Sequence, residues 1–293
     1  MGAFHLGFAE ALHRSGAKRT HCIEIAGASA GALVSAVLAT DTPLHAARIV
    51  LRDLASQARG AGPLGILTPG FSLVENVASA LDAHLPSDAA QRASEARLFV
   101  ALTSAVTGKT RYVSSWSTRD EFIDCVRASC DIPGVTGLLR ASSVPRAAGI
   151  KASPTTAHHD ELLALEQRTL LQRVLNRNDV DGGLFDLHPD PWRVDAAGSA
   201  TDASEEVHFV SPFSGSGLAV APPRSSSGAL SLPLGYGRTV DASAANFARA
   251  VHALRPPSDS VLASYEAEGF ASAESFFKSI ARAVRPDSCL HFD

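Results

Sequence analysis

The spacing of apolar residues predicts alternating helices and strands along the first half of the chain. Phe4, Phe8 and Leu12 recur every four residues ahead of Gly16, as on the buried face of a helix that ends at a glycine. Runs rich in apolar and β-branched residues are typical of strands. The pattern predicts helices over residues 3–15, 30–40, 44–58, 73–85 and from 119, and strands over residues 21–25, 97–105 and 110–116.

Two of these helices carry a start signal in the sequence. Ser72 is followed three residues later by Glu75, and Thr118 is followed in the same way by Glu121. A hydroxyl residue three positions before a glutamate forms a capping box at a helix N-terminus. The two pairs therefore predict where these helices begin.

The second half of the chain is less regular. A Ser-, Pro- and Ala-rich stretch leads into a charged helical pattern at 160–177, and we interpret residues 135–175 as an insertion. Strands that alternate with helices favour a layered α/β fold. Beyond the insertion the pattern predicts a strand over residues 206–211, a loop over 214–238 and helices over 243–254, 259–268 and 272–284.

Composition and charge exclude some function classes. The net charge is -4, with 26 Lys and Arg against 30 Asp and Glu, so we expect no nucleic acid partner. The four cysteines form no metal-binding spacing, and their pattern favours a reduced, cytoplasmic compartment. The longest uncharged stretch, 25–40, is shorter than the roughly 20 residues of a membrane span. The sequence therefore predicts neither a transmembrane helix nor a metal site.

A candidate nucleophile follows the first predicted strand. Gly27, Ala28, Ser29, Ala30 and Gly31 match the GxSxG pattern between a strand and a helix, which is the setting of a nucleophile elbow. Ser29 would then present its hydroxyl at a helix N-terminus, and the Ala30 N–H would face a developing oxyanion. An ordinary Gly/Ser turn is the alternative interpretation of the same five residues.

The position of this elbow argues against an α/β-hydrolase fold. That fold needs several strands before its serine, and only one predicted strand precedes Ser29. A triad of Ser29, Asp181 and His208 is possible by sequence order but is poorly supported. His208 lies within a predicted strand, so we interpret it as a structural or surface residue.

Several motifs together resemble the patatin-like phospholipase family. They are residues 2–12, the GASAGAL segment at 27–33, residues 128–133 and the Asp-Gly-Gly at 181–183. Residues 210–215 and 254–257 further resemble the adipose triglyceride lipase-like subgroup. The resemblance implies a three-layer α/β/α fold with a mainly parallel central sheet and C-terminal helices. It divides the chain into an acyl hydrolase domain at 1–195 and a C-terminal strand and helical extension at 196–293.

The resemblance also implies a chemistry. Ser29 and Asp181 would form a catalytic dyad, with Gly182 and Gly183 giving the backbone room around the aspartate. Taken alone, Asp181 is better interpreted as part of an ordinary Asp-Gly turn, and the pairing with the serine motif favours the catalytic interpretation. The implied reaction is hydrolysis of a lipid ester, triacylglycerol or phospholipid, through an acyl-enzyme and without a metal or organic cofactor. The implied location is cytoplasmic and peripheral to a membrane or lipid droplet, and the residues name no protein co-activator.

The chain departs from the family at its start. Family members have a first strand and a GxGxxG loop that supplies oxyanion donors, and Gly2 matches the last glycine of that loop. We therefore expect a sheet without its first strand, with Gly2 and Ala30 as the oxyanion residues. The alternative function is a non-catalytic, lipid-surface or partner-binding relative with an incomplete oxyanion hole. His5 either lines the site or packs as a structural residue.

Overall fold

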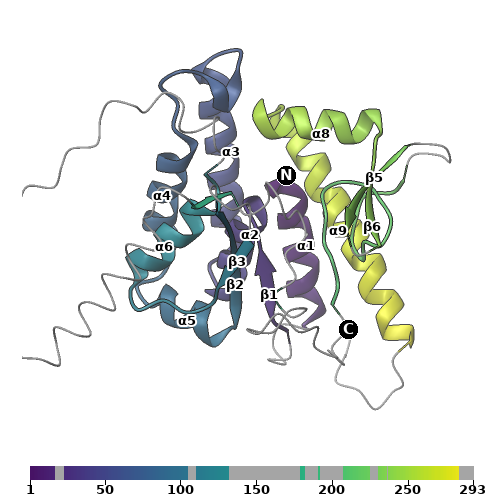
Figure 1. The fold of residues 1–293 in the computed structure, drawn as a ribbon, viewed down its shortest axis with the longest axis horizontal. Helices are drawn as coiled ribbons and strands as arrows, with labels where there is room; N and C mark the ends of the chain where they lie inside the picture. Colours follow the sequence, from purple (N-terminus) through teal and green to yellow (C-terminus); the bar gives the residue numbers. More distant parts are fainter. Residues whose placement is uncertain are drawn as a thin grey trace, which may run out of the picture.

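The computed structural model describes residues 1–16, 23–104, 110–131, 179–181, 191, 207–224, 230–235 and 237–283. Its helices are α1 (Gly2–Ser15), α2 (Ala30–Ala39), α3 (Leu44–Ala61), the 3₁₀ turn η2 (Gly65–Leu67), α4 (Leu73–His84), α5 (Ala89–Glu95), α6 (Arg119–Ala128), α8 (Ala244–Leu254) and α9 (Asp259–Ala283) (Figure 1). Its strands are β1 (Ile25–Gly27), β2 (Leu98–Ser104), β3 (Thr110–Val113), β4 (Asp179–Asp181), β5 (Ser231–Gly235) and β6 (Arg238–Asp241).

The larger of the two sheets is mixed. β1 runs parallel to β2, whereas β3 and β4 both pair with β2 in the antiparallel direction. β5 and β6 form a separate antiparallel pair. The α/β class is therefore confirmed, but within the described residues the expectation of a mainly parallel sheet is wrong.

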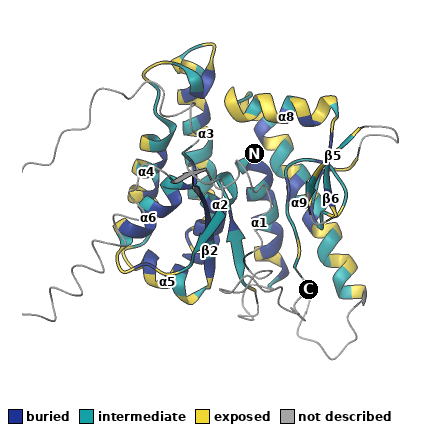
Figure 2. Cartoon of the chain, in the orientation of Figure 1, coloured by how far each residue is buried: buried dark blue, intermediate teal, exposed yellow. Residues whose placement is uncertain are grey.

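The main core lies on one face of β2. Leu98, Val100 and Leu102 alternate along the strand and are completely buried. They pack in one apolar cluster with residues of α2, α4, α5 and α6. Figure 1 shows α4, α5 and α6 gathered beside the strands, and Figure 2 shows that their buried sides face inward. These helices form one layer over the sheet, and the full three-layer arrangement stays a prediction.

Both capping boxes are confirmed. The hydroxyl of Ser72 accepts a hydrogen bond from the Glu75 N–H at 3.3 Å, and the hydroxyl of Thr118 accepts one from the Glu121 N–H at 3.1 Å. Among the described α-helices of the first half, the sequence missed only α5. That helix buries three alanines and no larger apolar side chain, so its periodicity is weak.

The first strand lies later than the sequence indicated. Residues 21–25 were predicted to form it, but β1 begins at Ile25 and ends at Gly27. Ile25 pairs with Leu98, the first residue of β2, and Arg97 before it has a positive φ of 51°. The pairing of β1 with β2 therefore cannot extend before Ile25 and Leu98. The side chains of the two preceding residues, Glu24 and Arg97, form an ion pair instead.

Three expectations for the second half are wrong. Residues 207–211 make only an isolated bridge from Val210 to Val220, so no strand forms there. β5 lies inside the predicted loop 214–238, because it pairs with β6. The two predicted helices at 259–268 and 272–284 are one helix, α9, which continues through Gly269. The 135–175 insertion and its charged helix lie outside the described residues.

Helix α9 is continuous because Gly269 serves close packing rather than helix termination. A Cβ on Gly269 would lie 2.1 Å from the carbonyl oxygen of Phe4 in α1. In return, a Cβ on Gly7 would lie 1.9 Å from the carbonyl oxygen of Glu266 in α9. Both distances are far shorter than any real contact, so the two backbones cross at a spacing that only glycine permits.

Aromatic side chains of α9 extend this contact. Phe270, Phe276 and Phe277 pack against buried residues of α1. The rings of Phe8 and Phe277 lie 6.1 Å apart. No helix within the described residues combines the length and the apolar character that a membrane-spanning helix needs.

Candidate active site

Ser29 occupies a sharp turn between β1 and α2. Its φ is 52° and its ψ is -124°, a conformation that residues other than glycine rarely adopt. Strained serines of this kind cluster at active sites, because the turn pushes the hydroxyl out of the strand direction. Ser29 is half-buried, so its side chain keeps access to solvent. This is the local geometry expected of a nucleophile elbow, the role predicted for residues 27–31.

The first glycine of the motif is required by space. A Cβ on Gly27 would lie 2.7 Å from the backbone carbonyl of Gly31, closer than real side chains approach. A Cβ on Gly31, by contrast, would meet nothing nearer than 3.8 Å, the distance to Nε2 of His5. Gly27 therefore lets the end of β1 pass over the first turn of α2, and Gly31 leaves room beside Ser29.

Ala30 and Gly2 are the two predicted oxyanion residues. Ala30 opens α2, so its N–H lies at the positive end of the helix dipole. Gly2 opens α1, and His5 lies three residues later, on the same side of that helix. Since Nε2 of His5 lies next to Gly31, the start of α1 borders the elbow.

Ser129 supports the elbow and was not singled out by the sequence analysis. Its hydroxyl accepts a hydrogen bond from the Ser29 N–H at 3.0 Å and donates one to the carbonyl oxygen of Ala101 at 2.8 Å. Ser129 is completely buried at the end of α6. It links the strained residue to the central strand β2, which makes it a positioning residue for Ser29.

Replacing Ser129 with alanine tests this link. The buried Ala101 carbonyl would lose its donor and the half-buried Ser29 N–H its acceptor, and an unsatisfied buried group costs about 1–3 kcal/mol. Because the lost contact holds the turn that carries the candidate nucleophile, we expect kcat for a soluble ester to fall about tenfold or more while KM changes little. Ser129→Thr, which keeps the hydroxyl, should restore part of the rate. An unchanged kcat in Ser129→Ala would show that the bond is dispensable.

Asp181 lies on the same edge of β2 as the elbow. β3 pairs along residues 100–103 and occupies one edge of β2. The other edge is shared: Gly27 of β1 pairs with Val100, and Asp181 of β4 pairs with Leu102. Because β1 is parallel to β2 and β4 is antiparallel, the two strands run toward each other along that edge.

The register brings the backbones of the two candidate residues close. Val100 and Leu102 are two residues apart on an extended strand, which is about 7 Å. Ser29 follows Gly27 by two residues, so the turn that carries it begins where β4 ends. A nucleophile and a carboxylate could meet at this edge.

Gly182 and Gly183, the two glycines predicted to make room around Asp181, fall outside the described residues. His208 is exposed, and its ring packs edge-on against Phe276 of α9 at 4.7 Å. No group of three or more potential metal ligands occurs among the described residues.

Comparisons with known proteins decide the family. A sequence model described as "Patatin-like phospholipase" matches residues 1–189. The chain belongs to the patatin-like phospholipase family. The matched region of this patatin-like protein includes the elbow, Ser129 and Asp181, and it ends before β5, β6, α8 and α9. The resemblance inferred from the motifs is thereby confirmed. No solved structure matches the chain.

Curated relatives cover the chain only in part. Patatin-like phospholipase domain-containing protein 4 of Homo sapiens is 34% identical over 47% of this chain and 54% of its own length. Patatin-like phospholipase domain-containing protein 2 of Rattus norvegicus is 36% identical over 47% of this chain and 29% of its own length. The human 1-acylglycerol-3-phosphate O-acyltransferase PNPLA3 is 34% identical over 40% of this chain and 24% of its own length. The chain thus spans about half, or less, of the length of these relatives.

Proposed function

We propose that this patatin-like protein hydrolyses lipid esters with Ser29 as nucleophile and Asp181 as general base. The observation that carries the proposal is the strained turn at Ser29, with φ 52°, at the edge of β2 where the strand of Asp181 ends. Membership of the family supports the lipid substrate. A general base must come within hydrogen-bond reach of the hydroxyl whose proton it takes, and the shared edge favours that approach.

The proposed reaction has two halves. The Ser29 oxygen bonds to the acyl carbon of the ester while its proton passes to the Asp181 carboxylate. The N–H groups of Ala30 and Gly2 stabilise the resulting oxyanion. The leaving alcohol takes the proton from Asp181, and an acyl-enzyme remains. Water then attacks the acyl carbon while Asp181 accepts a proton from it. The bond from the acyl carbon to the Ser29 oxygen breaks, Asp181 returns the proton to that oxygen, and the fatty acid leaves.

Cleavage of triacylglycerol or phospholipid at the surface of a droplet or membrane is the finer form of the proposal. Acyl transfer is a second candidate, favoured by the similarity to a relative named as an O-acyltransferase. The acyl-enzyme is common to both reactions, since only the second nucleophile differs: water in one case and a lipid hydroxyl in the other. Adding an acyl acceptor and following transesterification against fatty acid release separates them.

A fluorophosphonate probe tests the nucleophile itself, because it bonds covalently to activated serines. We expect the wild-type chain to be labelled and the modified peptide to contain Ser29. Ser29→Ala should remain unlabelled. Labelling of another serine would exclude Ser29 as the nucleophile. No labelling of a folded wild type would favour the non-catalytic alternative, a relative that binds lipid surfaces or partners.

A further inference from the structure

Helix α8 faces the opposite way from an ordinary surface helix. Surface helices normally bury their apolar side and expose their polar side. In α8, Asn246 and Arg249 are buried, at 5% and 8% exposure, whereas Phe247 is 72% exposed. The exposed residues of the helix are all apolar: Ala244, Ala245, Phe247, Ala250, Val251, Ala253 and Leu254. Figure 2 shows the outer side of α8 as a nearly continuous exposed strip.

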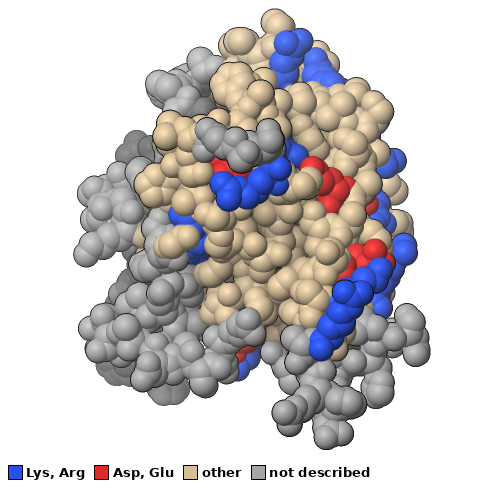
Figure 3. All heavy atoms as spheres, turned by 90° about the vertical axis from the view of Figure 1, so that its right-hand side faces the viewer, with Lys and Arg blue, Asp and Glu red and all other residues tan. Residues whose placement is uncertain are grey.

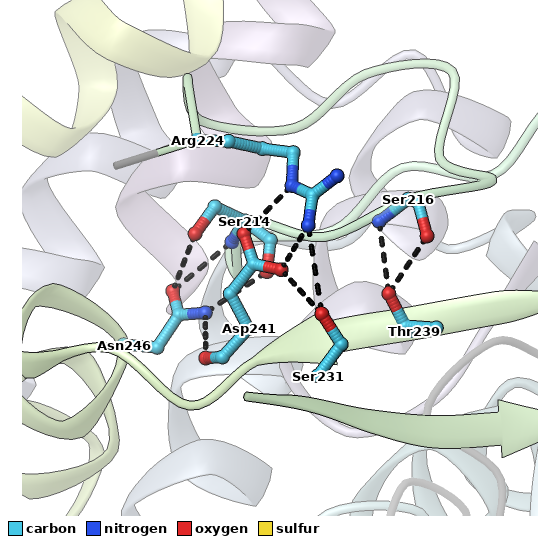
Figure 4. Close-up of polar contacts among 7 residues, drawn as sticks. All are labelled: Ser214, Ser216, Arg224, Ser231, Thr239, Asp241 and Asn246. Carbon is cyan, nitrogen blue, oxygen red and sulfur yellow. Dashed lines mark hydrogen bonds and ion pairs between the residues drawn. The ribbon is translucent and has the colours of Figure 1, made fainter. Parts of the chain in front are cut away.

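Buried polar contacts fix this orientation. The Asn246 side chain accepts from the Ser214 N–H at 3.0 Å and donates to the carbonyl oxygens of Ser214 and Asp241 at 2.9 and 2.8 Å (Figure 4). Arg249 donates to both carboxylate oxygens of Glu268 in α9 at 2.9 Å. Turning the helix to bury Phe247 would break all of these bonds in a buried setting, which is costly.

The hairpin beneath α8 is held in the same way. The guanidinium of Arg224 donates two hydrogen bonds to the carboxylate of Asp241, at 2.9 and 2.8 Å, and Ser231 donates a third at 3.1 Å (Figure 4). These bonds to Arg224 hold the pKa of the Asp241 carboxyl below its usual range. Asp241 ends β6 three residues before α8 begins, so the support of the helix is itself fixed.

Exposed apolar residues continue the strip at both ends of α8. At its C-terminal end, Leu64 is 56% exposed, and a Cβ on the next residue, Gly65, would lie 2.4 Å from the carbonyl oxygen of Leu254. At its N-terminal end, Leu230 is 72% exposed, and its carbonyl accepts from the Ala242 N–H at 2.6 Å. We call this surface the α8 ridge: Leu64, Leu230, Phe247, Val251 and Leu254.

The α8 ridge lies at the end of the molecule that carries the candidate site. Figure 1 shows α8 crossing above the start of α1, the end that carries Gly2. Burial and the charge of Arg249 lower the pKa of the Met1 amino group to about 6, which agrees with this closeness. A surface that covered the ridge would therefore also face the border of the elbow.

We propose that the α8 ridge docks the protein on a phospholipid surface, with α8 lying in the plane of the headgroups. The inference rests on the proposed function, which needs access to lipid esters. A short helix with one apolar face is suited to this position, because its side chains reach the boundary between headgroups and acyl chains. The exposed residues of 242–255 include no carboxylate, and Arg255 at the end of the helix is the one charged residue among them.

Size and charge argue for lipid over a second copy of the chain. The apolar area of five such side chains is on the order of 500 Å², below the roughly 800 Å² per partner of a stable dimer. On the face shown in Figure 3, charged residues of both signs form small neighbouring patches on a mostly uncharged surface. Docking should therefore depend on apolar insertion and persist at high salt.

Flotation with vesicles tests the proposal. The full chain is mixed with phosphatidylcholine vesicles, with and without phosphatidylserine, and centrifuged through a density gradient. We expect the wild type to float in both cases and the double variant Phe247→Gln, Val251→Gln to bind about tenfold or more weakly, because apolar burial is lost. Ile49→Gln is the matched control: its side chain is 54% exposed on α3, outside the ridge, so binding should be unchanged.

Parallel assays keep this proposal apart from the proposed function. The double variant should hydrolyse a soluble short-chain ester like the wild type, but lose activity on esters held in vesicles. Ser29→Ala should float like the wild type whatever its activity. A wild type that does not float, or a double variant that floats equally well, would overturn the docking role. So would a wild-type dimer that the double variant dissociates without any change in flotation, since the ridge would then bind a second copy.

Discussion

Ester hydrolysis is expected to fall by about a thousandfold or more when Ser29 is replaced with alanine. In the proposed mechanism the hydroxyl at this position forms the bond to the acyl carbon, and an alanine in the same turn, with φ 52°, offers no such group. Binding of the ester should be kept, because the alanine leaves the surrounding site in place. Rates on a soluble chromogenic ester, followed at substrate concentrations above and below KM, measure this directly.

The natural control for Ser29→Ala is a serine replacement outside the site. Ser94 in α5 donates its hydroxyl hydrogen bond to the Ala90 carbonyl within the same helix, at 2.8 Å, so Ser94→Ala should retain activity. Ser29→Ala should also unfold at about the same urea concentration as the wild type, because alanine keeps the Cβ and therefore the same backbone strain. Equal rates for Ser29→Ala and the wild type would exclude Ser29 as the nucleophile.

The largest loss of stability is expected for Gly269→Ala. The added methyl group would lie 2.1 Å from the carbonyl oxygen of Phe4, so α1 and α9 must move apart. Overpacking against rigid backbone costs about 3 kcal/mol or more. Urea unfolding followed by far-UV circular dichroism should show the drop. Gly7→Ala, whose methyl group would meet Glu266 at the same crossing, should behave alike.

A glycine-to-alanine replacement in α3 should instead increase the free energy of unfolding. A Cβ on Gly60 would meet nothing within 4 Å, and alanine is favoured over glycine in a helix by about 0.5–1 kcal/mol. Gly60→Ala is therefore expected to be slightly more stable than the wild type. If Gly269→Ala unfolded at the same urea concentration as Gly60→Ala, the close crossing of α1 and α9 would be refuted.

Local signals predicted the parts of the fold that depend on neighbouring residues. The capping boxes at Ser72 and Thr118 are formed within one turn of the helix, and both hold. The setting of Ser29 between a strand and a helix is equally local. The bounds of β1 were not predictable from nearby residues. They depend on its partner β2, which begins at Leu98, more than 70 residues later.

Long-range contacts explain most of what the sequence analysis missed. Gly269 has the appearance of a helix stop, and only its contact with Phe4 shows why α9 continues. Ser129 lies inside a segment that resembles the family, residues 128–133, but its role depends on Ser29, 100 positions away. The inverted face of α8 follows from the contacts of Asn246 with Ser214, which no periodicity could indicate.

The pairing of Ser29 with Asp181 stays a prediction, which rests on the sequence motifs and on the strand register together. The sequence paired Ser29 with Asp181 through the resemblance, and the register of β1 and β4 on β2 supports the pairing. Asp179 lies in the same short strand, opposite Ser104, and offers the same chemical group two residues away. The central question is whether the carboxylate at 181, and not the one at 179, activates Ser29.

The most direct measurement is the rate at which a fluorophosphonate labels Ser29 in the wild type, in Asp181→Asn and in Asp179→Asn, each checked for native circular dichroism. A positioned general base contributes about 100-fold or more, so labelling of Asp181→Asn should slow by at least that factor. Asp179→Asn should be labelled at nearly the wild-type rate. Undiminished labelling of folded Asp181→Asn would contradict the dyad.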